Sequence, residues 1–590
     1  MNKPLSDKIK FLISALIVLC SYIFVAAFYP MQYYTHDETD IQYTLSGAFS
    51  GKPYPNHPYI NIILGKPLSA LYSLIPSVQW WYVYGTLLLV VGSMLIYFSV
   101  LKIAEKYKMS LFMALAIILG IDVVFIVPLI ANYAYTLIGA VFGTGVLSVF
   151  FWFDRSNKKK RVSYYIFSVI GYVLVYIYRK ETGAVILCFL LLTFVMTLVF
   201  ERGINLKSVL FSLFICAFLG SITLGLTAIK KTSDEKYNGK GYTEFFDAWR
   251  NCRDYPFDTI EKNPELYKAA GWGEYEYWMF RSYRGTTDAM TTDSYKYIHE
   301  NSLDRTAYRK NIKEGIEITL QDGEFRGVLL FYTLTIVVLL LTLIQKFSLT
   351  SLFWILCNNG GLAILSGYLL LRGRFIYRSA YVIFIPAVII NIYFIAREKV
   401  ELKNIANYAL AVFILIVSVV STKGYFSTKA DRRYALEKCK TITEYELANK
   451  DNIFICLGNT YENYNPWMTF PDDKPINHMY GYSFRWGASK EQMRANGLDE
   501  NDEISPFLSD KTLILTEWDC DKKTSENKYN NSFYCYYDYL KERYGCIGFV
   551  KMDVIPGTDV CAYRLLFEDA KYPYPRIYDI VNGDVKENIF

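Results

Sequence analysis

Apolar stretches long enough to cross a membrane recur through the first 421 residues, and they restrict the fold of this chain more than any other feature. A helix needs roughly 20 apolar residues to cross about 30 Å of hydrocarbon. About eleven windows qualify: 11–28, 80–101, 111–130, 135–153, 164–178, 184–200, 209–229, 328–344, 349–371, 379–396 and 405–421. The sequence therefore predicts an α-helical polytopic membrane domain over residues 1–421.

Composition supports this class and excludes others. Only 20% of the 590 residues are charged, whereas 53% are hydrophobic, and the mean hydropathy is +0.17. A net charge of +6 without a long basic block gives no support for a nucleic-acid surface. Eleven scattered cysteines without a CxxC pair, and four dispersed histidines, make a Cys/His metal centre an unfavoured interpretation.

The short loops indicate how the chain is oriented. If the amino terminus is cytoplasmic, the inner short loops hold 17 Lys and Arg residues and the outer short loops hold 7. The positive-inside rule therefore predicts a multi-pass cell-membrane protein with a cytoplasmic amino terminus. Residues 30–79, 230–327 and 422–590 then lie outside the cytoplasm, all on one face.

The tail, residues 422–590, is long enough for its own core and predicts a small α/β domain. Its apolar runs lie at 452–457, 512–516, 545–550 and 560–567, and a helical stretch lies at 535–543. Six of the eleven cysteines occur here: Cys439, Cys456, Cys520, Cys535, Cys546 and Cys561. An external location permits disulfides, and singly buried thiols are the alternative.

Three carboxylates follow the first predicted helix, in the segment Tyr34-Thr35-His36-Asp37-Glu38-Thr39-Asp40. A Gly-x-x-x-Pro turn comes next at residues 51–55, and Lys66-Pro67-Leu68 precedes the second span. With Tyr43, this arrangement resembles the first extracytoplasmic loop of GT-C class glycosyltransferases that use lipid-linked sugars. The protein O-mannosyltransferase and aminoarabinose transferase branch matches best.

The resemblance implies an enzyme that moves a sugar from a polyprenyl-phosphate donor to a cell-envelope glycan, lipid or protein acceptor, with inversion. It implies that Asp37 is the catalytic acidic residue and that Lys66 binds the donor phosphate. Chemistry agrees, because a carboxylate can take the acceptor's proton and a cation can stabilise a leaving phosphate. The alternative is that Asp37, Glu38 and Asp40 cap a short helix. Asp40, His36 and His57 are expected to be structural or polar loop residues.

Further cations lie at the predicted outer ends of other spans. Arg179 and Lys180 separate two spans with almost no loop between them, so they either face a wet cavity or reach to the interface. Arg372, Arg374 and Arg378 oppose the positive-inside trend. We expect Arg374 or Arg378 to bind phosphate, with headgroup anchoring as the alternative.

These patterns predict a membrane glycosyltransferase with catalytic candidates Asp37 and Glu38, and donor-phosphate candidates Lys66, Arg179, Lys180, Arg374 and Arg378. The sequence leaves open whether a divalent cation assists the carboxylates. Aromatic side chains of the 230–327 segment predict membrane-interface contacts or, alternatively, sugar stacking. A transporter of lipid-linked oligosaccharide and a non-catalytic envelope scaffold are the rival functions. The near absence of charge inside the spans disfavours a transporter.

Overall fold

Eight helices of the computed structural model are long and apolar enough to cross a membrane, counted over the described residues. The structure describes residues 5–152, 158–202, 206–255, 257–281, 287–302, 308–321, 323–345, 347–398, 404–421, 429–457, 466, 477–479, 485–517, 520, 532–568, 577–581 and 584–588. Three other predicted spans have shorter apolar helices, Tyr135–Phe151, Val162–Tyr178 and Ala411–Val420. This agrees with the prediction of a helical polytopic membrane protein. The predicted inner-loop residue Lys346 lies outside the described residues.

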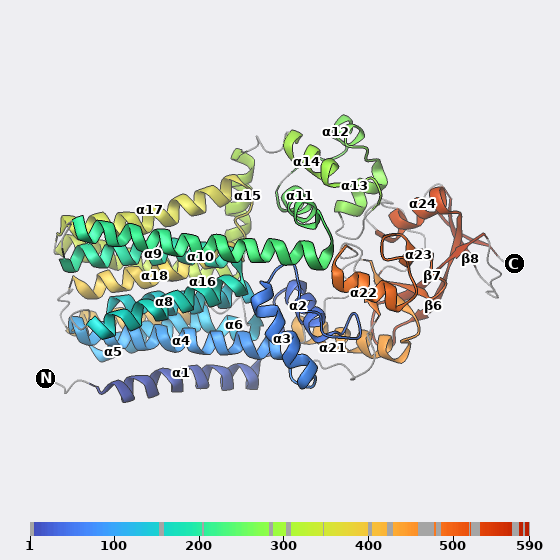
Figure 1. Ribbon diagram of the computed structural model, residues 1–590. Coiled ribbons are helices and arrows are strands. Elements are labelled where there is room, and N and C mark those ends of the chain that lie inside the picture. Colours follow the sequence, from blue (N-terminus) through green and yellow to red (C-terminus); the bar gives the residue numbers. More distant parts are fainter. Residues whose placement is uncertain are drawn as a thin grey trace.

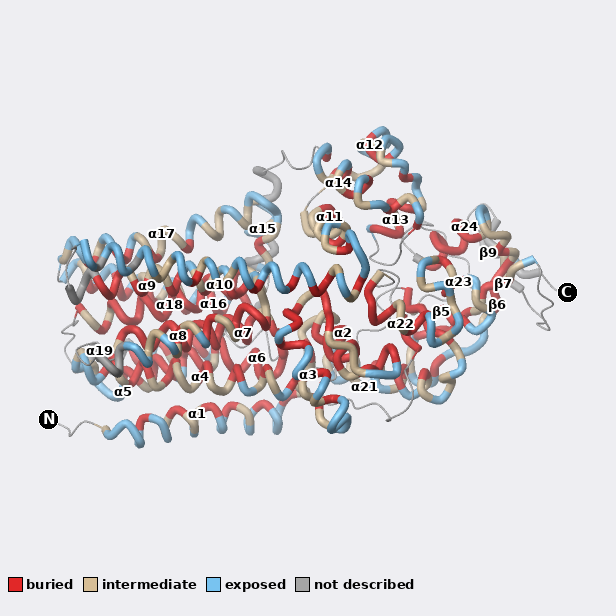
Figure 2. Tube along the Cα trace, viewed as in Figure 1, coloured by how far each residue is buried: buried red, intermediate tan, exposed pale blue. Residues whose placement is uncertain are grey.

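The helices of the bundle lie side by side along one axis (Figure 1). They are α1 (Asp7–Phe28), α4 (Trp80–Tyr107), α5 (Leu111–Ile121), a π-helical turn (Asp122–Ile126), α6 (Val127–Ala131), α7 (Tyr135–Ser148), α8 (Lys158–Tyr178), α9 (Lys180–Arg202), α10 (Leu206–Asn238), α16 (Gly323–Gln345), α17 (Leu349–Leu371), α18 (Tyr377–Arg397) and α19 (Asn404–Ser421). Helix α18 is buried along nearly its whole length. By contrast, α1, α10 and α17 expose apolar side chains such as Leu12, Leu224 and Ile364, which suits contact with lipid (Figure 2).

Asp122 is a carboxylic acid buried inside the bundle, where the sequence predicted almost no charge. Asp122 begins the π-helical turn and is 4% exposed. It accepts hydrogen bonds from the hydroxyls of Ser21, at 2.6 Å, and Tyr97, at 2.5 Å. These bonds satisfy a polar group that lipid cannot solvate, and they connect the turn to α1 and α4.

All the longer segments outside the bundle lie at the end opposite the amino terminus (Figure 1). The first outer segment contains β1 (Gln32–Tyr33), α2 (His36–Ser46) and α3 (Ile62–Leu74), and β2 (Asn132–Tyr133) joins it. The long outer segment contains α11 (Tyr242–Asp254), α12 (Pro264–Ala269), α13 (Glu274–Arg281), α14 (Thr292–Asn301) and α15 (Tyr308–Gln321).

The tail contains a sheet of seven strands in the order β4-β3-β5-β7-β6-β8-β9. Strand β3 pairs in parallel with β4 and β5, and the remaining pairs are antiparallel. The elements are α21 (Lys429–Ala448), β3 (Ile453–Cys456), β4 (His478–Met479), α22 (Gly487–Ala495), α23 (Ser505–Leu508), β5 (Thr512–Thr516), α24 (Ser532–Tyr544), β6 (Cys546–Val554), β7 (Cys561–Phe567), β8 (Ile577–Val581) and β9 (Asp584–Asn588). The four predicted apolar runs correspond to β3, β5, β6 and β7, and the predicted helical stretch corresponds to α24.

Each face of this sheet shares a hydrophobic core with residues of one outer segment. Side chains alternate along a strand, so Phe454 and Cys456 of β3 face one side, where Phe49 of the first outer segment packs. Ile453 and Ile455 face the other side, in a core shared with α24 and with aromatic residues of α12 and α13. Helix α21 and Phe49 therefore cover one face of the tail sheet, α24 covers the other, and α13 of the long outer segment packs on α24. Its six cysteines are buried thiols.

Candidate active site

Backbone pairing fixes where the first outer segment leaves the membrane helix α1. Strand β1 pairs in parallel with β2, and the amide of Tyr34 donates to the carbonyl of Tyr133 at 2.8 Å. Thr35 then occupies the position that caps the amino end of α2. Asp37 consequently lies in the first turn of α2, where helix amides favour negative charge.

Glu38 anchors this turn to the bundle. Its carboxylate accepts hydrogen bonds from the Thr35 amide at 3.0 Å, from the Thr35 hydroxyl at 2.6 Å, and from the Tyr135 amide at the start of α7 at 3.2 Å. The side chain is fully buried. Burial, followed by the charge of Asp37, raises the pKa of Glu38 to about 7. Glu38 therefore performs the capping role that was the alternative interpretation for this acidic segment.

Asp37 has a different environment, because its side chain is 17% exposed and is surrounded by positive groups. Arg378 Nη1, at the start of α18, lies 3.5 Å from Asp37 Oδ2. His36 Nε2 lies 3.7 Å from Oδ1. Burial opposes ionisation, but His36, Arg378 and Arg179 together hold the pKa of Asp37 below its ordinary value. Asp37 is thus an ionised carboxylate that an external molecule can reach.

Arg179 completes the positive side of this site. It occupies the single position between α8 and α9 and donates to the hydroxyl of Tyr135. Its guanidinium lies 4.9 Å from the ring centre of Tyr135 and 5.6 Å from that of Tyr59. Glu181 pairs with it at 3.0 Å. Arg179 and Arg378 lie at the ends of different predicted spans, yet both are close enough to Asp37 to lower the pKa of its carboxyl group.

A pocket of about 180 Å³ adjoins this cluster through the Tyr59 side chain, which contributes to both. Three lysines line the pocket, Lys180 of α9 and Lys230 and Lys231 of α10. Lys230 is largely buried, donates to the carbonyl of His57 at 3.0 Å, and pairs with Asp234. Lys180 is half-buried and Lys231 is exposed, so both residues keep surface that solvent can reach.

The other predicted cations lie elsewhere. Arg374 pairs with Asp254 of α11 at 3.1 Å. Lys66 is exposed on α3, and none of its contacts among the described residues joins it to Asp37. Arg372 stacks over the ring of Tyr255 at 5.2 Å. The structure therefore brings together Asp37, Glu38, Arg179 and Arg378, places Lys180 beside them, and leaves Lys66 and Arg374 apart.

The two histidines of the first outer segment differ from each other. His57 is fully buried, and burial together with Lys230 lowers its pKa to about 3, so the imidazole is neutral. It accepts a hydrogen bond from the Tyr59 amide and contacts the ring of Trp486 in the tail at 5.0 Å. The neutral His57 ring is packed against the tail, whereas the half-buried His36 lies beside Asp37.

Several members of the site were not predicted. Tyr59 and Tyr135 are ordinary aromatic residues in a chain with 52 tyrosines, so no sequence signal separates them. Lys230 and Asp234 had a usable signal, because oppositely charged residues four positions apart at the end of an apolar helix form a pair. Comparison of this chain with protein-family models, with curated proteins and with solved structures found no match.

The site favours an anionic ligand. Two guanidinium groups already lie around Asp37, and the Glu38 oxygens accept three hydrogen bonds, so a divalent cation here would meet positive charge and engaged ligands. A phosphate, by contrast, suits Arg and Lys donors. The arrangement can accept a proton at Asp37 while it holds a negatively charged group nearby.

Proposed function

We propose that this protein is an integral membrane glycosyltransferase that transfers a sugar from a polyprenyl-phosphate donor to a cell-envelope acceptor. One observation supports this above all: an ionised, partly exposed carboxylate lies among arginines and beside a lysine-lined pocket, at the end of a helical membrane bundle. The resemblance of the Asp37-Glu38 segment to GT-C transferases points the same way.

The residues of the site have three roles: acceptance of a proton, stabilisation of the phosphate, and positioning of the proton acceptor. In the transfer step a bond forms between an acceptor oxygen and the anomeric carbon of the sugar, and the bond from that carbon to the phosphate oxygen breaks. Asp37 receives the acceptor's proton, and the electron pair leaves with the lipid phosphate. Arg378 and Arg179, together with Lys180 and Lys231 of the pocket, stabilise the growing negative charge of the phosphate.

Glu38 acts as a positioning residue. Two of its hydrogen bonds, from Thr35, cap the first turn of α2. The third, from the Tyr135 amide, joins this turn to α7 and so helps to fix the carboxylate of Asp37 relative to Arg378. A displacement of about 1 Å at such a site costs on the order of a hundredfold in rate. The buried Glu38 therefore contributes to transfer without contacting the sugar.

The lipid part of the donor has a path to the pocket. The pocket residues Thr227, Lys230 and Lys231 lie near the end of α10. Earlier turns of α10 are exposed and apolar, as at Leu224, whose side chain is 73% exposed. A polyprenyl chain in the bilayer can pack along these turns while its phosphate reaches the lysines.

The test is a transfer assay with the full-length protein in lipid vesicles. Radiolabelled sugars on polyprenyl phosphate, supplied as a panel, are incubated with an extract of cell-envelope acceptors, and protein-dependent transfer is measured. Asp37→Asn keeps the shape of the side chain but removes the base, so transfer should fall about 10²- to 10⁴-fold while donor binding persists. Asp254→Asn is the matched control, because Asp254 also pairs with an arginine at this end of the bundle.

The outcome separates the candidate functions. Normal transfer by a folded Asp37→Asn protein contradicts the catalytic assignment. The wild-type protein would instead be a transporter if it transfers no sugar of the panel but moves an intact lipid-linked sugar between the two leaflets.

A further inference from the structure

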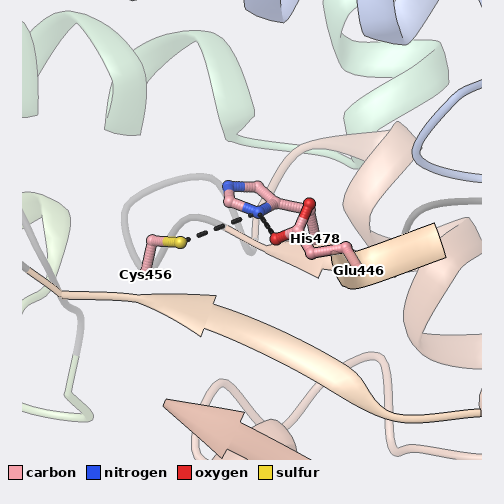
Figure 3. Close-up of side chains that lie close together, drawn as sticks. All are labelled: Glu446, Cys456 and His478. Carbon is pink, nitrogen blue, oxygen red and sulfur yellow. Dashed lines mark hydrogen bonds and ion pairs between the residues drawn. The ribbon is translucent and has the colours of Figure 1, made fainter. Parts of the chain in front are cut away.

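Three side chains that can bind a metal meet inside the tail, away from Asp37. They are Glu446 of α21, Cys456 of β3 and His478 of β4, and all three are buried (Figure 3). They form the one cluster of three or more His, Cys, Asp or Glu side chains, among the described residues, that could hold a metal ion. Their ligand atoms all lie within 4.8 Å of one another. We propose that this group binds one zinc ion, which fastens the first outer segment to the tail.

The fold explains why the three residues meet. Phe454 of β3 is directly opposite His478 of β4, so these two side chains share one face of the sheet. Cys456 lies two positions after Phe454 on the same strand, so it shares that face as well. Helix α21 packs on that face, since Ile442 belongs to the same core as Phe454 and Cys456. Glu446 is four positions after Ile442 and therefore points from the same side of the helix.

All three ligand atoms lie within 4.8 Å of one another, so shifts of the side chains would place them around one tetrahedral zinc ion. His478 Nδ1 lies 2.8 Å from Glu446 Oε1 and 3.7 Å from Cys456 Sγ. With Zn–N and Zn–O near 2.0–2.1 Å and Zn–S near 2.3 Å, ligand atoms lie about 3.3–3.6 Å apart. Binding thus requires the carboxylate to withdraw by about 0.5 Å from the imidazole. The three side chains supply three ligands, which leaves one position for water.

The chemistry of the ligands selects the metal. A thiolate and an imidazole favour zinc over magnesium or calcium, which prefer a full set of oxygen ligands. One thiolate and one carboxylate carry two negative charges, which neutralise Zn²⁺ and remove the cost of burying an ion. Each of the three residues has a relative exposure of 1% or less. Burial of all three ligands gives a substrate no access, so an ion here is structural although its fourth position is open.

The site is connected to the first outer segment. The ring of Phe49 stacks on the ring of His478, with 6.4 Å between centres and 15° between planes. Phe49 is 4% exposed and follows α2, which carries Asp37. An ion that fixes His478 therefore also fixes the surface on which this part of the outer segment packs.

The experiment measures metal content in the full-length protein, purified in detergent through a tag that contains no histidine. Mass spectrometry of the metals should find near-stoichiometric zinc in the wild type. Cys456→Ala and His478→Gln should lose it, whereas Cys439→Ser should retain it, because Cys439 is buried on the same helix as Glu446 but lies outside the group. The readout does not involve sugar transfer, so it is independent of the proposed function.

A second measurement keeps the inference testable if the variants do not fold. Wild-type protein stripped with a chelator and supplied with Co²⁺ should show the near-ultraviolet absorption of a thiolate–cobalt bond and the strong visible bands of tetrahedral cobalt. Wild-type protein that holds no zinc after incubation and dialysis, and shows no thiolate–cobalt absorption, overturns the proposal. Zinc retained in full by folded Cys456→Ala also overturns it.

Discussion

Arg378 Nη1 lies 3.5 Å from Asp37 Oδ2, although 341 positions separate the two residues in the chain. The same guanidinium lies 3.4 Å from the hydroxyl of Thr35, which caps α2. One arginine at the start of α18 thus contacts both the end of α2 and its acidic first turn. Any movement of α18 relative to α2 changes the charge that surrounds the candidate base.

Replacement of Arg378 by Ala should reduce transfer about tenfold to a hundredfold, the usual effect of losing a charge-assisted contact. Because Arg378 lowers the pKa of Asp37, its removal should raise that pKa, and the acidic limb of the pH–rate profile should move to higher pH. Arg374→Ala is the control, since Arg374 pairs with Asp254. If Arg378→Ala and Arg374→Ala lose equal amounts of transfer activity and the acidic limb of the pH–rate profile does not move, Arg378 has no specific role in the reaction.

The raised pKa of Glu38 makes thermal stability depend on pH. In the folded protein this pKa is about 7, above the ordinary 4.5, so folding favours the protonated form. The stabilisation is present below pH 4.5 and is lost as pH rises through 7, a difference of about 3 kcal/mol. Glu38→Gln cannot ionise, so its melting temperature should fall less than that of the wild type between pH 5 and 8. Parallel melting curves across this range would contradict the assignment.

Gly65 allows a close approach within the first outer segment. A Cβ atom at this position of α3 would lie 1.9 Å from the carbonyl oxygen of Pro55, so the backbone would have to move. Gly65→Ala should lower both thermal stability and transfer. Gly360→Ala tests the same substitution in a helix where nothing lies within 4 Å of the new atom, and it should behave like the wild type. A Gly65→Ala protein as stable as the control would mean that the segment rearranges freely.

The orientation in the membrane can be read with engineered cysteines. Asp553 is exposed on β6 of the tail, and Lys8 is exposed at the opposite end of the molecule. The loops with 17 Lys and Arg residues are predicted to be cytoplasmic and those with 7 to be external. Asp553→Cys should then react with an impermeant maleimide in intact cells, and Lys8→Cys should react only after lysis. The parent chain supplies the background of its native cysteines. The reverse pattern would invert the orientation.

Local patterns predicted much of the fold. Apolar windows located the eight helices of the described residues that are long and apolar enough to cross a membrane, and three shorter apolar helices. Short apolar runs located β3, β5, β6 and β7. The alternation along β3 could not reveal that each face meets a different outer segment, because both faces are apolar. These contacts join segments that are far apart in the sequence, so they depend on how the whole chain packs.

The candidate site was predicted in part for the same reason. Asp37 and Arg378 were identifiable because charges beside membrane spans are costly without a partner or a function. Which cation meets which carboxylate depends on helix packing, so Arg374 and Arg378, four positions apart, have different partners. Cys456 and His478 appeared unrelated in the sequence, and they meet only because β3 and β4 pair in parallel.

The cores that the tail shares with the two outer segments limit how this protein can be divided. A version that ends at residue 421 would leave Phe49 and the aromatic residues of α12 and α13 without the tail residues that share their cores. Burial of one such ring contributes about 1.5–3 kcal/mol, so several uncovered rings would promote aggregation. An exchange of tails between two proteins of this design would succeed only if both outer segments were exchanged as well. A change in the buried residues of the tail therefore requires matched changes in the distant residues of both outer segments that share these cores.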